Sequence, residues 1–349
     1  TGPALDWMKS YFKDRYQFVN ISGSESQKHR LEYGVPQGSV IGPFCFPKYS
    51  SPLAKIAEKH GVYYHLYADD TQLYMMFNAG DGANAVARLE DCISEIRQWM
   101  TNNMLKLNDN KTKFMVLGSR RTIHDVSDIT SLQVGESSIE VTSVARNIGA
   151  VMDRTLDMHN HVKSICKSSY INLRNISKIR KFLTEDAAAI LVHSLVISKL
   201  DNLNALLYGL PDSTLHRLQL IQNHAAKIVV RKKKSDHVTP IMMSLHWLPI
   251  AYRIKYKVLL LTHKCIYGKA PGYLSSLLSR YEPGRALRSA DNYLLNEKQM
   301  RLKTYGDRAF SAAAPTLWNS LPVVIRKCDC EDRFKKALKT FLFKKAFDV

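Results

Sequence analysis

From residue 61 to residue 77 the side chains alternate between two sets with a period of two, and two adjacent acids, Asp69 and Asp70, interrupt the run. A period of two is typical of β-strands, because successive side chains of a strand point to opposite faces. The pattern therefore predicts a β-hairpin with the two aspartates at its tip. Apolar residues then recur at steps of three and four from Val86 to Met100, which predicts a helix whose apolar stripe packs on the sheet.

Residues 105–151 have a mixed pattern. Two short runs, at residues 114–117 and 139–141, are strand-like. The segment between them is rich in Ser, Asp and Thr, so it is expected to be a loop. Strand signals fade after residue 153, and helices are expected from there on.

Three helices are predicted in the second half, at residues 184–200, 212–228 and 251–267. Thr184 is the expected N-cap of the first, and Asp212 or Ser213 that of the second. The predicted fold class is therefore α+β. It consists of a mixed domain at residues 1–152 and a mostly α-helical domain at residues 153–349.

The charge of the chain is unevenly distributed. Fifty Lys and Arg against 31 Asp and Glu give a formal net charge of +19 over 349 residues. Residues 1–150 hold 16 of each kind, so the whole excess lies in residues 151–349. Such a basic half favours a polyanionic partner, nucleic acid first and an acidic membrane surface second. The apolar share of 45% and the charged share of 23% indicate a folded protein.

Cysteine usage and hydropathy predict an intracellular protein, nuclear or cytoplasmic. The six cysteines lack the repeated spacing of a disulfide framework or a zinc module, so they are expected to be reduced. The sequence has no apolar run of about 18 residues and no signal peptide, so no membrane association is expected. Because the chain opens with Thr1 rather than Met, it is expected to be a fragment or a processed product.

The adjacent acids Asp69 and Asp70 admit two interpretations. Aspartate is a common turn residue, so a pair at a hairpin tip needs no further role. The flanking apolar residues favour the second interpretation, because two carboxylates held against Leu66, Tyr67 and Leu73 repel each other unless a cation lies between them. A hard divalent metal ion bound through carboxylate oxygens is the expected cation.

About thirty residues upstream, the stretch GVPQGSVIGP at residues 34–43 predicts a tight turn that delivers Ser39 as the N-cap of a helix. Backbone amides at such a turn, with Gln37 and Gly38 beside them, can approach a phosphate, a sugar or a base edge. The turn alone is a weak signal. Its combination with YADD at residues 67–70 is highly specific.

Together the two motifs resemble those of the reverse transcriptases of non-LTR (LINE-type) retrotransposons, and the resemblance extends over nearly the whole chain. The further stretches that carry it are DWMKSYF at residues 6–12, NMLKLN at 103–108, NIG at 147–149, LLYGLP at 206–211, LHWLP at 245–249 and APTLWNSLP at 314–322. The resemblance implies a right-hand polymerase fold, with a partial palm at residues 1–152 and a thumb and C-terminal region at residues 153–349.

The resemblance also implies RNA-directed DNA synthesis with two divalent metal ions, Mg²⁺ or alternatively Mn²⁺. The implied partners are an RNA template, a DNA primer and deoxynucleoside triphosphates. The residues implied in the chemistry are Asp69 as principal metal ligand, Asp70 as its support, Lys111 as the group that neutralises or protonates pyrophosphate, Tyr67 beside the primer end, Gln37, Gly38 and Ser39 against the template or incoming nucleotide, and Gly149 in the primer-grip region.

Two features depart from the family pattern. A motif resembling Asp-x-x-x-Ala-Phe-Asp, which carries a further metal ligand, is not in the sequence, so it and the fingers are expected to lie before residue 1. This polypeptide alone is therefore expected to be inactive, because losing a ligand that holds both ions removes the organised site. Pro47 is the second departure, since inside a helix it costs about 3 kcal/mol. Decay of an old element copy is one hypothesis for it.

Two basic segments in the second half each admit a structural and a binding interpretation. The run of cations Arg231, Lys232, Lys233 and Lys234 suits either compensation of a helix dipole or binding of nucleic-acid phosphates. Residues 333–347 interleave cations with phenylalanines, which favours an amphipathic closing helix over a nucleic-acid face with stacking aromatics.

The main alternative to a polymerase fragment is a non-catalytic nucleic-acid-binding or interaction protein derived from a retroelement. A third possibility is a translation product without a stable fold. His159 and His161 are not expected to form a metal site, because residues two apart on a helix diverge.

Overall fold

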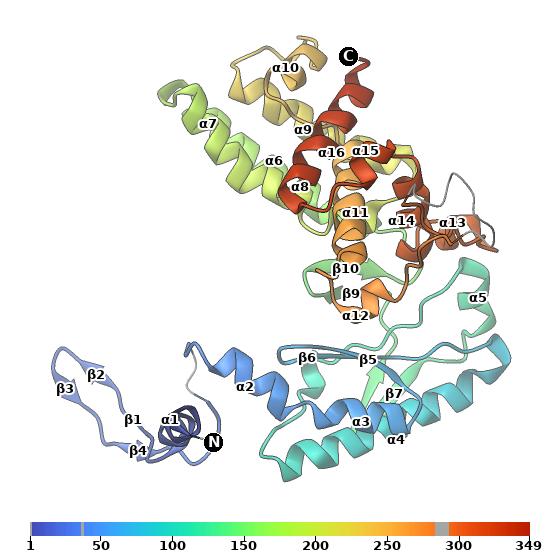
Figure 1. Cartoon of the computed structure of the whole chain (residues 1–349). Coiled ribbons are helices and arrows are strands. Elements are labelled where there is room, and N and C mark those ends of the chain that lie inside the picture. Colours follow the sequence, from blue (N-terminus) through green and yellow to red (C-terminus); the bar gives the residue numbers. More distant parts are fainter. Residues whose placement is uncertain (1, 36–37, 283–292) are drawn as a thin grey trace. The chain divides into compact units, whose positions relative to one another are not determined.

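The structure is a computed structural model, and it describes residues 2–35, 38–282 and 293–349 (Figure 1). The chain divides into two compact units, Thr1–Ser143 and Val144–Val349. The elements of the first unit are α1 (Pro3–Phe12), β1 (Tyr16–Gln17), β2 (Asn20–Ile21), β3 (Ser24–Glu25), β4 (His29–Arg30), α2 (Gly42–Tyr49), α3 (Pro52–Lys59), β5 (Tyr63–Tyr67), β6 (Asp70–Tyr74), η1 (Ala79–Asp81), α4 (Gly82–Asn102), η2 (Asp109–Lys111), α5 (Arg120–Asp125), β7 (Ser131–Val134) and β8 (Ser137–Glu140).

The second unit opens with one hairpin and is otherwise helical. Its elements are β9 (Val144–Asn147), β10 (Ala150–Asp153), α6 (His159–Ile179), η3 (Arg180–Phe182), α7 (Glu185–Val192), η4 (His193–Ile197), α8 (Ser198–Asp201), η5 (Asn204–Leu207), α9 (Asp212–Val229), α10 (Thr239–Ser244), α11 (Ile250–Ile266), α12 (Gly272–Ser275), α13 (Lys303–Gly306), α14 (Phe310–Asn319), α15 (Val323–Arg326) and α16 (Glu331–Phe347). In the described residues no named strand follows β10, as the pattern predicts.

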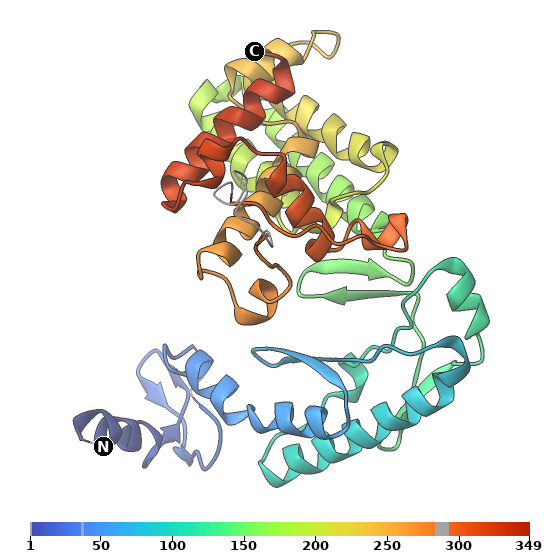
Figure 2. The same ribbon diagram turned by 45° about the vertical axis from the view of Figure 1, so that its right-hand side comes forward.

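The predicted hairpin and the helix after it are confirmed as β5, β6 and α4. Strands β5 and β6 pair antiparallel, and α4 lies along them and along α3 (Figures 1 and 2). The expected stripe of α4 is buried at Ile93 and Ile96, which pack with Ile56 of α3 and with Leu73 of β6. Burying each such side chain contributes about 1.5–3 kcal/mol, so this stripe fixes the hairpin on the helix.

The segment expected to be a loop before residue 139 is not one. It contains the short helix α5 and the strand β7, which pairs with β8. Leu132 and Val134 of β7 are buried and alternate with exposed Gln133, as expected for a strand. The strand was not predicted because it is only four residues long. In the run at residues 114–117, Phe114 forms an isolated bridge with Val141.

The segment before residue 36 adds little to the core of the first unit. Helix α1 buries no residue. Strands β2 and β3 form a hairpin that is flanked by the β1–β4 pair, and all four are exposed two-residue strands. Large apolar side chains are left in solvent, with Trp7 53% and Ile21 70% exposed. Packing energy therefore does not hold this segment in place.

Pro47 lies inside α2, as the sequence predicts. Its ring has no N–H to donate to the carbonyl four residues back, which costs about 3 kcal/mol in a helix interior. Helix α2 buries only Gly42, so it offsets little of this cost by packing.

The helices predicted in the second unit are present. The first is α7, which continues without a break through the π-helical η4 into α8, and the Thr184 hydroxyl caps it by accepting from Ala187 N at 3.2 Å. The third is α11. For the second, α9, the predicted cap is wrong, because the chain enters the helix at Pro211 without a side-chain cap. Asp212 instead lies in the first turn of α9, where a negative charge is favourable to the helix dipole.

The closing segment is the amphipathic helix α16. Phe334 and Leu338 are fully buried and pack with Trp318 of α14. Phe341 and Phe343 are half-buried against the same cluster, which favours the structural interpretation of these phenylalanines over base stacking. In the described parts of the chain, every helix is too short or too polar to cross a bilayer.

Candidate active site

The two predicted catalytic acids lie at the tip of the β5–β6 hairpin. Tyr67 pairs with Asp70, so Ala68 and Asp69 form a two-residue turn. Ala68 has a φ of +53°, a left-handed conformation that costs an alanine on the order of 1–2 kcal/mol. Strained residues of this kind occur preferentially at functional sites, where the surrounding structure holds them.

Register places Asp70 on the solvent face of the hairpin. Residues that pair directly share a face, so Asp70 lies beside Tyr67 and on the same side as the Tyr63–Tyr74 pair. The rings of Tyr63 and Tyr74 stack with centroids 5.3 Å apart, and Tyr67 is 61% exposed. The acids therefore lie at the tip of a hairpin whose solvent face carries exposed aromatic rings, and a base can stack on such rings.

The apolar setting expected for the two carboxylates is wrong. Leu66 and Leu73 lie on the opposite face of the hairpin, with Leu73 in the core, whereas Asp69 and Asp70 are exposed. Water therefore relieves their mutual repulsion. Within the described residues neither side chain has a hydrogen bond or an ion pair, so their oxygens are free to bind a ligand.

Two exposed carboxylates fit one kind of metal site. Mg²⁺ keeps several waters and is commonly held by one or two carboxylates together with substrate phosphates. Asp69 and Asp70 provide such a donor set. The described residues contain no group of three His, Cys, Asp or Glu side chains that could hold a metal ion by itself.

The glycine-rich turn before α2 is only partly described. Gln37 lies outside the described residues, and Gly38 has a φ of +83°, which a side chain would strain. The expected N-cap role of Ser39 needs correction, because the residue at the N-cap position is Ile41. The Ser39 hydroxyl instead accepts from Gly42 N at 3.1 Å and lies 2.7 Å from the Tyr11 hydroxyl, which ties the turn to α1.

Lys111 ends the short helix η2, and Asn108 caps this helix by accepting from Lys111 N at 3.3 Å. The Lys111 side chain is exposed, and within the described residues no hydrogen bond joins it to the hairpin. The turn before it is held by Arg97, which donates to Asp109 and, at 3.1 Å, to Val134 O. The same guanidinium lowers the pKa of Asp109. Sequence reasoning missed this pair.

Gly149 lies at the β9–β10 turn with a φ of +86°, beside a cavity of about 400 Å³. Arg146 and Lys199 also line this cavity, and so does His161, which is only 4% exposed. His161 Nδ1 accepts from Val151 N at 3.3 Å, so the ring proton is on Nε2, which is buried and has no partner in the described structure. This convergence could not be predicted from the sequence, because it brings residues of a hairpin and of two helices together.

The cations after α9 divide between the two interpretations. Arg231 Nη2 donates to Arg180 O at 3.2 Å, Lys181 O at 3.3 Å and Leu183 O at 2.9 Å, so Arg231 compensates a helix end. Lys232, Lys233 and Lys234 are exposed. The structural interpretation therefore holds for the arginine, and binding stays a prediction for the three lysines.

Comparison with known proteins defines the class to which this site belongs. The sequence model of the family described as reverse transcriptase (RNA-dependent DNA polymerase) matches residues 1–169. This range contains both the glycine-rich turn and the hairpin with Asp69 and Asp70. Residues 1–169 therefore belong to the reverse transcriptase family.

Curated relatives give the finer relationship. The probable RNA-directed DNA polymerase from transposon BS of Drosophila melanogaster is 25% identical over 239 residues, which cover 65% of this chain and 25% of that protein. The corresponding probable polymerase from transposon X-element of the same species is 24% identical with the same coverage. The RNA-directed DNA polymerase from mobile element jockey is 24% identical over 164 residues, 45% of this chain and 17% of that protein.

Residues 1–169 are thus a reverse transcriptase sequence, and the chain is similar to the RNA-directed DNA polymerases of non-LTR retrotransposons, as the motifs indicated. The matches span about a quarter or less of the length of these relatives.

Proposed function

We propose that the chain is part of an RNA-directed DNA polymerase of a LINE-type element and that it provides the catalytic hairpin. The observation that carries the proposal is the pair Asp69 and Asp70, free of other partners, at an exposed hairpin tip within the matched range. Under this proposal residues 1–152 are part of the palm, and residues 153–349 are the thumb and C-terminal region. The substrates are an RNA template, a DNA primer and deoxynucleoside triphosphates.

The residues of the chain have distinct roles in this proposal. Asp69 is the principal ligand of Mg²⁺, or of Mn²⁺ in its place, and Asp70 supports it. When bound, the metal ions activate the primer 3′-hydroxyl and steady the triphosphate and the departing pyrophosphate. Tyr67 packs beside the primer end, and exposed Lys111 neutralises the pyrophosphate or gives it a proton.

The remaining contacts are with nucleic acid and nucleotide. Gln37, Gly38 and Ser39 contact the template or the incoming nucleotide, and the backbone at Gly149 contacts the primer. The lysines at 232–234 supply charge for the phosphates. Their placement on an exposed surface of the basic unit supports this role.

We further propose that residues 1–349 alone do not polymerise. Two carboxylates do not organise two metal ions, and the family motif with a further aspartate is not in this sequence. The expected result is therefore binding without synthesis. Filter binding should show retention of an RNA template annealed to a DNA primer, with an affinity that falls as salt rises. Primer extension on the same preparation should give no product.

Each assay has a clear opposing outcome. Extension by residues 1–349 unaided would contradict the claim that a further aspartate is required. Failure to bind any nucleic acid at low salt would contradict the proposed function as a whole.

A non-catalytic nucleic-acid-binding protein is the second candidate. The confinement of the +19 net charge to residues 151–349 favours it, because that part does not include the hairpin. The two candidates separate when the further aspartate motif is supplied. A polymerase then extends a primer, and a binding protein does not.

A further inference from the structure

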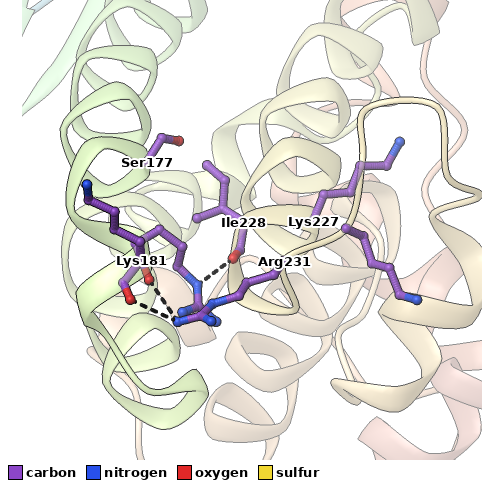
Figure 3. Close-up of a pocket in the computed structure, with 7 residues that line it drawn as sticks. Ser177, Lys181, Lys227, Ile228 and Arg231 are labelled. Atoms are coloured by element: carbon purple, nitrogen blue, oxygen red, sulfur yellow. Dashed lines mark hydrogen bonds between the residues drawn. The ribbon is translucent and has the colours of Figure 1, made fainter.

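A cavity of about 340 Å³ lies in the second unit, between the C-terminal ends of α6 and α9 (Figure 3). Its charged lining residues are all cations, namely Arg180, Lys181, Lys227, Arg231 and Lys232. They come from two helix ends that are distant in sequence but packed side by side (Figures 1 and 2). Tertiary packing therefore brings five positively charged side chains together around this cavity, and no carboxylate is among its lining residues.

The two arginines cap each other's helices. Arg180 is 8% exposed and donates from Nε to Ile228 O at 2.8 Å and from Nη2 to Val229 O at 2.6 Å, at the end of α9. Arg231 follows α9 in a left-handed conformation, φ +53°, and its guanidinium returns to the end of η3. Figure 3 shows the Arg231 side chain reaching across to the helix that carries Lys181.

The helix ends balance only part of this charge. A helix C-terminus carries about half a negative elementary charge, so two ends offset roughly one arginine. In the described residues no carboxylate forms an ion pair with either arginine. Burial, followed by the charge of Arg231, lowers the pKa of Arg180, and the nearby carboxylate of Glu185 raises it. Excess positive potential therefore remains at this cavity.

The lysines at the rim are available to a ligand. Lys181 and Lys232 are exposed, and their ammonium groups have no hydrogen-bond partner in the described residues, although Lys181 lies over the Phe182 ring at 4.8 Å. Lys227 donates to Lys234 O at 2.6 Å and keeps two further N–H groups. The Ser177 hydroxyl adds a neutral donor at the same rim (Figure 3).

We propose that this cavity binds a backbone phosphate of the nucleic acid. The two arginines supply fixed positive charge, and the lysines contact the phosphate directly. The ammonium groups are flexible point charges that suit a phosphate, whereas the arginines are already fixed by the helix ends. The proposal rests on the proposed function, because it names where the basic unit holds the nucleic acid. It adds a contact remote in sequence from the catalytic motifs.

The test is the double variant Lys181→Gln/Lys232→Gln in the full chain. Neither side chain caps a helix, so the variant should keep its circular dichroism spectrum and melting temperature. Its affinity for a fluorescent RNA–DNA duplex should fall about tenfold at 100 mM salt, and the slope of log K against log salt should flatten by about two. Fluorescence anisotropy between 50 and 200 mM salt measures both quantities.

The matched control is Lys336→Gln/Lys339→Gln, which removes the same charge from exposed positions of α16. We expect less than a twofold change for it. An equal loss in both variants would overturn the proposal, because net charge rather than the cavity would then explain binding. If the wild-type chain binds no duplex, the proposed function itself fails. If it binds and the cavity variant is unaffected, only the cavity proposal fails.

A second arm separates possible sources of phosphate. Inorganic phosphate and pyrophosphate should compete with the duplex for the wild-type chain more effectively than for the cavity variant. Binding to phosphatidylserine vesicles that the cavity variant loses, with duplex affinity unchanged, would assign the cavity to a membrane surface and overturn the proposal.

Discussion

Replacing Asp69 with asparagine is expected to lower the rate of primer extension by about a thousandfold or more. Substituting residues that only orient a metal ligand costs about 10–100-fold, so loss of the ligand itself should cost more. The substitution keeps the size of the side chain and removes a carboxylate that is exposed and unpaired in the described structure, so stability should not change. A lower rate would therefore report the loss of the metal ligand and not a loss of folded protein.

The measurement requires a polypeptide that extends primers. We would join the segment of a related reverse transcriptase that carries its first catalytic aspartate to residue 1, and measure single-nucleotide addition with Mg²⁺. Asp91→Asn is the matched control, since Asp91 is an exposed acid of α4 outside the hairpin. It should change the rate less than twofold. Similar rates for Asp69→Asn and the control would exclude Asp69 as a metal ligand.

The second unit is expected to lose stability steeply as pH falls from 7 to 5. His161 and His263 are 4% and 0% exposed, and burial is the largest cause that lowers the pKa of each. Below pH 6.5 the unfolded chain then binds protons that the folded chain does not. Each histidine can remove up to about 1.4 kcal/mol per pH unit in that range, and the two together about 2.7.

Substitutions that keep the hydrogen bonds provide the control. His161 Nδ1 accepts from Val151 N, which an asparagine oxygen can imitate, and His263 Nε2 donates to Cys328 O at 2.9 Å, which a glutamine amide can imitate. His161→Asn/His263→Gln should therefore flatten the pH dependence. Urea unfolding at pH 7, 6 and 5, followed by the fluorescence of buried Trp247 and Trp318 with Trp7 and Trp99 changed to Phe, measures it. Equal stability of the wild type at pH 7 and 5 would contradict the account.

The parts of the fold that could be predicted are those with a long, consistent period. The run around residues 61–77 and the stripe from Val86 to Met100 each repeat often enough to specify a hairpin and a helix, and both are present. Strand β7 could not be found in this way, because four residues give only two apolar positions. The β9–β10 turn was equally hidden, since Ile148 adopts a φ of +42° that its residue type does not suggest.

The residues of the candidate site could be predicted from the sequence, but the side chains that surround them could not. The motifs alone selected Asp69 and Asp70. The prediction that apolar side chains surround them was wrong, and the alternation of the strand could have shown this. Leu66 and Tyr67 are neighbours in a strand and must face opposite ways, so an acid beside Tyr67 lies away from Leu66. The convergence of Arg180 and Arg231 could not be predicted, because it depends on how α6 and α9 pack.

The most direct test of the central claim is to locate the divalent metal on the chain. Mn²⁺ would be titrated into the ¹⁵N-labelled protein, and paramagnetic broadening of backbone amide signals followed by NMR. The account predicts that the amides of residues 67–70 broaden first, that excess Mg²⁺ restores them, and that Asp69→Asn removes the effect. Broadening that begins elsewhere, or a hairpin untouched by millimolar Mn²⁺, would contradict the assignment of these two aspartates to metal binding.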